Sequence, residues 1–263
     1  FKRAGFPDGV VNTVTGFPEE VGVPLVCHPD VAKIAFTGGE AGGVAVYKSA
    51  AADLKHVTLE LGGKSANVVF EDADVESAAN GVISGIFAAT GQTCIAGSRL
   101  VVHKRVHDQV LEKVVALAKT ARLGNPMNLE TQVGPITTLA QRDKVHAYIG
   151  VDAADGARCE LGGKKPESGD LAEGWFVEPT IFSNVKNEMR VAQEEIFGPV
   201  LSVIAFEDED EAFAIANDTK YGLGAGLWTT DIGRAIRGAS RLQAGTVWVN
   251  TYRAVSYMAP FGG

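Results

Sequence analysis

Cysteine is scarce in this sequence. The chain has three cysteines, Cys27, Cys94 and Cys159, and they lie far apart along it. Three scattered thiols exclude a disulfide framework and a tetrahedral cysteine metal site, and they are typical of a protein from a reducing compartment. We therefore expect a cytoplasmic protein with no metal site.

Long apolar runs and basic clusters are also missing. The longest weakly polar stretch, residues 81–91, is far shorter than the roughly 20 residues that span a bilayer. The formal net charge is -8, and no cluster of lysine and arginine offers a surface to a polyanion. We therefore expect no membrane partner and no nucleic-acid partner.

What remains is an ordinary globular composition. The chain has 263 residues, of which 46% are hydrophobic and 21% charged. This balance supports one large core or two smaller ones and excludes disordered and collagen-like chains. The first residues, FKRAGFP, are typical of a helix end running into a turn, and the last, PFGG, form a loop with no element after it. We expect both ends to be cut from a longer chain.

Alternating apolar and helical segments predict an α/β fold. In the first third, residues 10–14 and 31–36 favour buried strands, a helix of small residues is expected over 39–52, and a further strand is expected over 56–61. This strand–helix–strand order predicts a parallel sheet. Further strands are expected at 66–70, 100–103, 200–206, 225–228 and 246–249, and helices at 74–89, 106–121, 138–153, 209–217 and 232–242. The rest of residues 122–180 is rich in proline and glycine and is expected to form loops, and a domain boundary is expected near Gly62 and Gly63.

A glycine-rich segment, FTGGEAGG at residues 36–43, lies between a predicted strand and a predicted helix. Backbone there can approach a phosphate closely, because glycine has no Cβ and a helix N-terminus has unpaired N–H groups. The segment is no P-loop, since Val44 and Ala45 follow where Lys and Ser or Thr are needed, and it lacks the GxGxxG order. Glycines that only allow tight packing are an equally good interpretation.

Three other segments contain candidate chemical groups. Glu60, in LELGGK at residues 59–64, is a candidate general base, although a strand-edge glutamate paired with a lysine is favoured locally. Cys94, in GQTC at residues 91–94, is a candidate reactive thiol on a turn, although inert burial is the default for a cysteine and is accepted for the other two. In EEIFGP at residues 194–199, two carboxylates could bind a ribose or a cation, or they could end a solvated helix.

Taken together and in this order, five motifs resemble the aldehyde dehydrogenase superfamily. They are FTG at 36–38, LELGGK at 59–64, GQTC at 91–94, EEIFGP at 194–199 and PFGG at 260–263, and the resemblance covers essentially the whole chain. It implies that residues 1–62 are the C-terminal half of a Rossmann-type coenzyme domain. Residues 63–263 would be an α/β catalytic domain with a truncated C-terminal end. The full-length protein would be a homodimer or homotetramer.

The resemblance also implies roles for individual residues. Cys94 would attack an aldehyde to give a thiohemiacetal, which passes hydride to the nicotinamide of NAD or NADP and leaves a thioester. The backbone amide of Cys94 would supply half of an oxyanion hole, and Glu60 would activate the water that hydrolyses the thioester. Glu195 would hold the nicotinamide ribose, with Phe197 beside the ring. The rest of the coenzyme site would comprise Thr37, Gly38, Gly39, which stands where many members have serine, Gly43 and Leu61.

The substrate is the least determined property. By resemblance, the aldehyde pocket would be lined by Thr93, Ile95, Arg253, Val255 and Phe261, with the loop over residues 251–257. The apolar members suit a medium apolar or aromatic aldehyde. Arg253 could attract the carboxylate of a semialdehyde acid, although a solvated or salt-bridged arginine is favoured. NAD and NADP are not distinguished, because the adenosine-ribose contacts would lie upstream of Phe1.

Two other classes of protein stay open. A relative that transfers the acyl group to coenzyme A or phosphate would share the cysteine chemistry, but the presence of Glu60 counts against it. A non-catalytic protein of the same fold is a third possibility, and the intact Cys94, Glu60 and Glu195 count against that. Because the asparagine of the oxyanion hole and a joining strand would lie outside residues 1–263, we expect this chain alone to be inactive and prone to aggregation.

Overall fold

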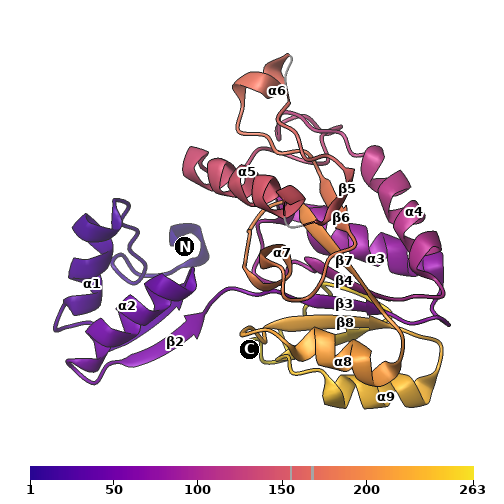
Figure 1. Cartoon of the computed structure of the whole chain (residues 1–263). Helices are drawn as coiled ribbons and strands as arrows, with labels where there is room; N and C mark the ends of the chain where they lie inside the picture. The colour runs from indigo at the N-terminus through magenta and orange to yellow at the C-terminus, as the bar shows by residue number, and fades with distance from the viewer. Residues whose placement is uncertain (155, 167–168) are drawn as a thin grey trace. The chain divides into compact units, whose positions relative to one another are not determined.

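The computed structural model of the protein describes residues 1–154, 156–166 and 169–263 (Figure 1). The chain divides into two compact units, Phe1–Leu61 and Gly62–Gly263. Within the described ranges, no helix is long and apolar enough to cross a membrane.

The first unit is organised by two parallel strands. β1 (Lys33–Thr37) and β2 (His56–Glu60) pair in parallel and are joined by α2 (Glu40–Ala51), which confirms the predicted strand–helix–strand unit. Their register places Thr37 opposite Glu60. Short helical turns precede the pair: η1 (Lys2–Ala4), η2 (Pro18–Gly22) and α1 (Val23–Cys27).

One strand expected in this unit is wrong. Residues 10–14 form bends and irregular backbone, and Val10, Val11 and Val14 are exposed. A run of only five residues is too short for its hydrophobic pattern to distinguish a strand from a loop. The strand expected at residues 31–36 exists as β1, but it is not buried throughout, because only Ile34 is buried in it.

The second unit is built on one seven-stranded sheet, in the order β5-β6-β7-β4-β3-β8-β9. All neighbouring pairs are parallel except β5 and β6, which are antiparallel. The strands are β3 (Ala66–Val69), β4 (Arg99–His103), β5 (Arg158–Leu161), β6 (Thr180–Ser183), β7 (Val200–Phe206), β8 (Gly224–Trp228) and β9 (Thr246–Val249). The helices are α3 (Val75–Phe87), α4 (His107–Lys119), α5 (Leu139–Ala154), α6 (Asp170–Glu173), α7 (Arg190–Gln193), α8 (Glu209–Asn217) and α9 (Ile232–Arg241), with the 3-10 turn η3 (Ala88–Gly91).

Helices cover both faces of this sheet. Leu100 and Val102 of β4 pack in a cluster with residues of α3 and α4, whereas Val101 between them packs with residues of α8. This alternation is the two-residue period of a strand buried on both faces. It explains why β4 reads as a continuous apolar run in the sequence and why all its residues are buried.

The predicted strands and long helices of the second unit are confirmed to within about two residues. Asp74 is the N-cap of α3, as expected, because its Oδ1 accepts a 2.8 Å bond from the N–H of Ser77. The loops expected over residues 122–180 are partly wrong, since β5 and α6 lie there and β6 begins at Thr180. β5 has no apolar alternation and no buried residue, so periodicity did not mark it. Residues 155 and 167–168 of that region lie outside the described residues.

Candidate active site

Cys94 lies on a strained turn between α3 and β4. After the helix ends, Ala89, Thr90 and Gly91 have positive φ angles of 51°, 57° and 67°. Two of these residues are not glycine, and left-handed backbone at such residues persists only where the surroundings fix it. A second turn follows at Cys94, in which the N–H of Ala96 donates to the carbonyl of Thr93 at 3.0 Å. The cysteine is therefore presented by a turn of defined shape.

Contacts from distant segments hold this turn. A Cβ atom at Gly91 would lie 2.1 Å from the carbonyl oxygen of Gly198, so the two backbones touch in a way that only glycine permits. The Oε1 atom of Gln92 accepts hydrogen bonds from the N–H and the hydroxyl of Thr137, at 2.9 and 2.8 Å. The turn is thus fixed at Gly91 and at Gln92.

Gly62 and Gly63 join the cysteine turn to the loop that carries Glu195. A Cβ at Gly63 would lie 2.2 Å from the carbonyl oxygen of Cys94, and one at Gly62 would lie 2.4 Å from Oε2 of Glu195. The N–H of Gly63 also donates to Oε1 of Glu195 at 3.1 Å. Three of the motifs found in the sequence therefore meet at one place in the second unit.

The backbone of the loop that carries Glu195 and Phe197 is held by α5. Phe197 has a φ of 59°. Gln141 Nε2 donates to the carbonyls of Ile196 and Phe197, at 2.8 and 3.0 Å. A small cavity beside this loop is lined by parts of all three motifs, among them Gly63, Gly91, Thr93, Glu195 and Phe197.

The two neighbouring carboxylates, Glu194 and Glu195, do different things. Glu194 accepts hydrogen bonds from Arg190 at 2.8 and 3.0 Å and from the hydroxyl of Tyr148. These hydrogen bonds from Arg190 and Tyr148 lower the pKa of Glu194 to about 2. Glu194 is therefore part of an ion-paired cluster, and Glu195 is the carboxylate next to the cysteine turn.

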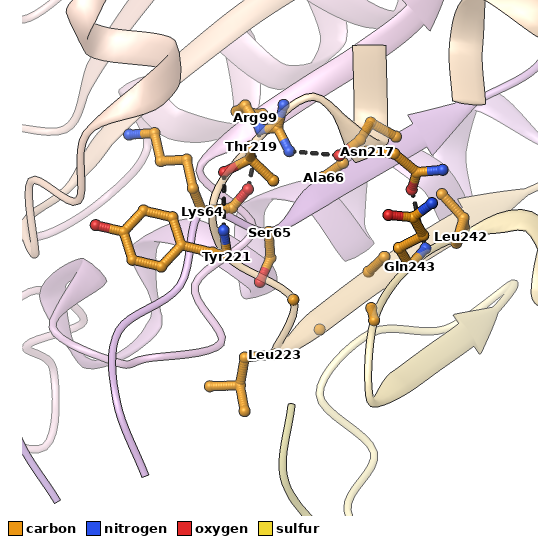
Figure 2. A pocket seen from close by; sticks show the side chains of 15 residues that line it. Lys64, Ser65, Ala66, Arg99, Asn217, Thr219, Tyr221, Leu223, Leu242 and Gln243 are labelled. Atoms are coloured by element: carbon orange, nitrogen blue, oxygen red, sulfur yellow. Dashed lines mark hydrogen bonds between the residues drawn. The ribbon is translucent and has the colours of Figure 1, made fainter. Parts of the chain in front are cut away.

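Sequence patterns did not identify the buried cation that anchors this region. Arg99 lies at the start of β4, where its side chain lines a small pocket (Figure 2). It is 1% exposed. Its guanidinium donates to the carbonyl oxygens of Lys64, Ile215 and Ala216, at 2.9, 2.9 and 2.7 Å, and to Oδ1 of Asn187 at 3.1 Å. Burial lowers the pKa of Arg99 to about 10, so it stays charged at neutral pH. The available signal was a charged residue directly before the apolar run of β4.

Glu60 lies in the first unit, at the last position of β2. Its carbonyl accepts a 3.1 Å bond from the N–H of Gly38. The Oε2 atom of its side chain is buried and finds no hydrogen-bond partner among the described residues. Glu60 is therefore not the lysine-paired strand-edge glutamate that local sequence favoured.

The glycines around the start of α2 have different surroundings. A Cβ at Gly38 would lie 2.6 Å from the ring of Phe36, and one at Gly43 would lie 2.6 Å from the side chain of Leu61. A Cβ at either position would force the neighbouring side chain to move. Nothing lies within 4 Å of a Cβ at Gly39, so the N-terminus of this twelve-residue helix has an open face. Thr37 ends β1 beside it.

The predicted substrate residues are spread over the cysteine turn and the last loop. Thr93 has a buried hydroxyl oxygen with no partner among the described residues. Ile95 is 7% exposed and packs in the hydrophobic core of the second unit. Val255 and Phe261 are 62% and 39% exposed. Their place in a substrate pocket stays a prediction.

Arg253 lies near the turn that carries Cys94. Its Nη1 atom donates to the carbonyls of Ser84 and Ala88, both at 3.4 Å, at the C-terminal end of α3. The preceding residue, Tyr252, is buried and donates its hydroxyl to the carbonyl of Ile95 at 3.0 Å. The last loop is therefore fastened to both sides of the cysteine turn.

Several predicted site residues come together in each unit. Thr93, Cys94, Glu195 and Phe197 gather in the second unit, where Gly63 touches the backbone of Cys94. Thr37, Gly38, Gly39, Gly43, Glu60 and Leu61 gather in the first, where β1 and β2 end beside the start of α2. In the part of the chain that the structure describes, no group of three or more His, Cys, Asp or Glu side chains could hold a metal ion.

The sequence profile of the aldehyde dehydrogenase family matches residues 1–263, and the chain belongs to this family. Over its whole length it is 47% identical to the betaine aldehyde dehydrogenase of Brucella anthropi and covers 54% of that protein. Among solved structures, PnpE from Pseudomonas sp. WBC-3 is 49% identical, with a TM-score of 0.97, and this whole chain covers 54% of it.

Betaine aldehyde dehydrogenase (betB) from Staphylococcus aureus, solved in complex with NAD+, is 40% identical, with a TM-score of 0.96, and this whole chain covers 52% of it. The chain thus spans about half the length of the curated relatives it matches. The predicted family and the predicted α/β fold are confirmed.

Proposed function

We propose that the complete protein containing this chain oxidises an aldehyde to a carboxylic acid, with NAD or NADP as the hydride acceptor. The observation that carries the proposal is the steric fit between Gly63 and Cys94, with Glu195 held by the same glycine. A Cβ atom at position 63 would lie 2.2 Å from the carbonyl oxygen of Cys94, so only glycine fits at this position. Such a fit is expected where a thiol must be placed accurately against a substrate.

Cys94 is the nucleophile in this proposal. Its sulfur attacks the aldehyde carbon to form a thiohemiacetal, and loss of hydride from that carbon leaves a thioester on the sulfur. The left-handed turn at Ala89, Thr90 and Gly91 sets the direction of the cysteine. Contacts of Gly91 with Gly198 and of Gln92 with Thr137 keep the turn rigid, so the thiol needs no rearrangement before it reacts.

Glu60 is the general base in this proposal. A buried carboxylate oxygen with no protein partner is costly unless something else occupies its hydrogen-bonding capacity. A water molecule bound to Oε2 would satisfy it, and the same contact would deprotonate that water as it attacks the thioester.

The residues present fit a dinucleotide. When bound, NAD or NADP would accept the hydride released from the thiohemiacetal. The open N-terminus of α2 at Gly39 suits a pyrophosphate, because helix N-termini attract anions and no Cβ blocks the approach. Glu195 suits a ribose, since Gly63 fixes one carboxylate oxygen and the other can accept from a hydroxyl. Phe197 lines the same cavity and offers a ring face.

Water, rather than coenzyme A, is the proposed acyl acceptor, because Glu60 is present to activate it. We further propose a cytoplasmic homodimer or homotetramer, in line with the reducing conditions that three unpaired cysteines need. The names of the relatives suggest betaine aldehyde as one substrate to test, and the apolar side chains of Val255 and Phe261 suggest apolar aldehydes.

The proposal is tested by measuring NAD(P)H formation by the complete protein with aliphatic, aromatic, carboxylated and betaine aldehydes, with and without coenzyme A. We expect turnover without coenzyme A that Cys94→Ala abolishes. Cys27→Ala, a change at an exposed cysteine, is the matched control and should keep the activity. No turnover with any aldehyde would leave the shared fold without this activity, and turnover only with coenzyme A would favour the acylating class.

A further inference from the structure

Arg253 is placed beside the cysteine turn from two directions. Tyr252, its neighbour, is fixed by its hydroxyl bond to the carbonyl of Ile95, which directly follows Cys94. The Arg253 guanidinium itself reaches the carbonyl of Ala88, directly before the strained turn. The arginine and the nucleophile are therefore attached to the same short segment of backbone.

The contacts of Arg253 do not use its full capacity. A guanidinium carries five N–H donors, and both bonds come from Nη1. Both are 3.4 Å long, which is beyond the range of about 2.7–3.2 Å for well-formed bonds. Among the described residues Arg253 makes no ion pair with a carboxylate, so it is not the salt-bridged arginine that was one of the expected alternatives, and its side chain is half-buried.

The backbone at Arg253 is also unusual. Its φ is 64°, in the left-handed region that favours glycine. A non-glycine residue keeps such a backbone conformation only where its surroundings or its function demand it. Here the buried Tyr252 fixes the chain before the turn, and the left-handed residue directs the guanidinium towards the end of α3.

From these observations we propose that Arg253 binds a carboxylate on the substrate, so that the enzyme's preferred aldehydes are semialdehyde acids. The inference rests on the proposed function and names the substrate class of the same site. Arginine is always charged, and it binds carboxylates through two parallel hydrogen bonds, for which Nε and Nη2 provide the donors. A substrate that spans Cys94 and Arg253 carries an aldehyde at one end and a carboxylate at the other.

The same charge disfavours a cationic substrate. Betaine aldehyde carries a quaternary ammonium group close to its aldehyde carbon, and a guanidinium beside the cysteine turn repels it. Binding of a cation at such a site would need carboxylates or aromatic faces. The positive charge at position 253 therefore favours an anionic substrate over a cationic one in this chain.

The test compares kcat/KM of the complete protein for succinic semialdehyde, butanal and betaine aldehyde. Butanal has the same carbon chain without the carboxylate, so the ratio of succinic semialdehyde to butanal isolates the charge. We expect wild type to prefer succinic semialdehyde by about tenfold or more, and raised salt to shrink the preference. Arg253→Gln keeps a donor for the carbonyls of α3 but removes the charge, and should reduce the ratio by about tenfold or more.

Two further variants make the result specific. Arg253→Lys should restore part of the ratio, because it restores the charge but not the paired donors. Arg105→Gln removes one charge from an exposed arginine two residues after the end of β4 and should leave the ratio unchanged. A wild type that prefers butanal or betaine aldehyde overturns the inference while supporting the proposed function, and so does an unchanged ratio in Arg253→Gln. No turnover with any aldehyde overturns both.

Discussion

The backbone N–H of Gly63 donates to Oε1 of Glu195 at 3.1 Å, while a Cβ at the same glycine would lie 2.2 Å from the carbonyl oxygen of Cys94. One glycine thus touches the proposed nucleophile and the proposed ribose ligand together. Because both contacts involve the backbone of Gly63, neither can relax independently of the other. The accuracy of the site depends on the absence of a single methyl group.

Gly63→Ala should therefore damage the site more than an ordinary glycine substitution. The added Cβ meets backbone, which cannot swing away, so we expect a loss of about 1–3 kcal/mol in the free energy of unfolding and at least a tenfold loss of kcat. Thermal unfolding and NAD(P)H formation measure the two effects. Gly150→Ala is the control, because nothing lies within 4 Å of a Cβ there. Within α5 it should stabilise by about 0.5–1 kcal/mol. Equal behaviour of the two variants would contradict the steric role of Gly63.

Tyr252→Phe tests the tie between the last loop and the cysteine turn. Loss of the hydroxyl leaves the carbonyl of Ile95 without its 3.0 Å bond in a buried place, and we expect a cost of about 1–3 kcal/mol, together with a lower kcat. Tyr257→Phe makes the same chemical change on a side chain that is 98% exposed. Its stability should stay within about 0.5 kcal/mol of wild type. Melting curves of both variants decide the matter, and equal melting temperatures would show that the bond carries no stability.

Much of the fold was open to prediction from local pattern. The helix expected at residues 209–217 coincides with α8, because Asp208 caps a helix with a clear apolar face. Strands buried on both faces, such as β4, show as continuous apolar runs. β5 was missed because an antiparallel edge strand of four residues, Arg158–Leu161, needs neither alternation nor burial. Its existence depends on pairing with β6, which no local window contains.

The sequence predicted which motifs form the candidate site, but it did not predict which of their residues touch one another. The resemblance to a family selected Cys94 and Glu195, but no spacing rule brings residues about a hundred positions apart into contact. The role of Gly62 and Gly63 as close-approach positions is visible only once the loop of Glu195 lies against them. Arg99 was missed for a related reason. Its partners are carbonyl groups of Lys64, Ile215 and Ala216, and every residue has a carbonyl, so sequence does not mark them.

A pH-dependent effect is expected at Asp72. Burial alone would raise its pKa, but hydrogen bonds from Thr229 and Thr230 outweigh it and lower the pKa from 3.8 to about 2. Because the folded state favours the charged form, Asp72 stabilises the protein above pH 3.8, and this stabilisation is lost as the pH falls through about 2.

Asp72→Asn should accordingly lower the melting temperature at neutral pH, and the difference from wild type should shrink towards about pH 2 as the wild-type carboxylate becomes protonated. Asp210→Asn is the control. It breaks an ion pair with Arg241 on a carboxylate that is 84% exposed, and such pairs contribute little. Melting temperatures measured across the acid range would contradict the prediction if the Asp72→Asn difference were constant with pH.

Glu60→Gln separates the two halves of the proposed reaction. Formation of the thiohemiacetal and release of hydride need Cys94, whereas hydrolysis of the thioester needs a base for water. We therefore expect Glu60→Gln to form one NAD(P)H per active site rapidly. Its steady-state rate should then be about 10²–10⁴-fold below that of wild type. Rapid-mixing absorbance measures the burst, and the mass of the stalled protein should rise by one acyl group on Cys94. Cys94→Ala should show neither burst nor mass change. A Glu60→Gln variant with wild-type steady-state turnover would remove Glu60 from the mechanism and assign activation of the water to another group.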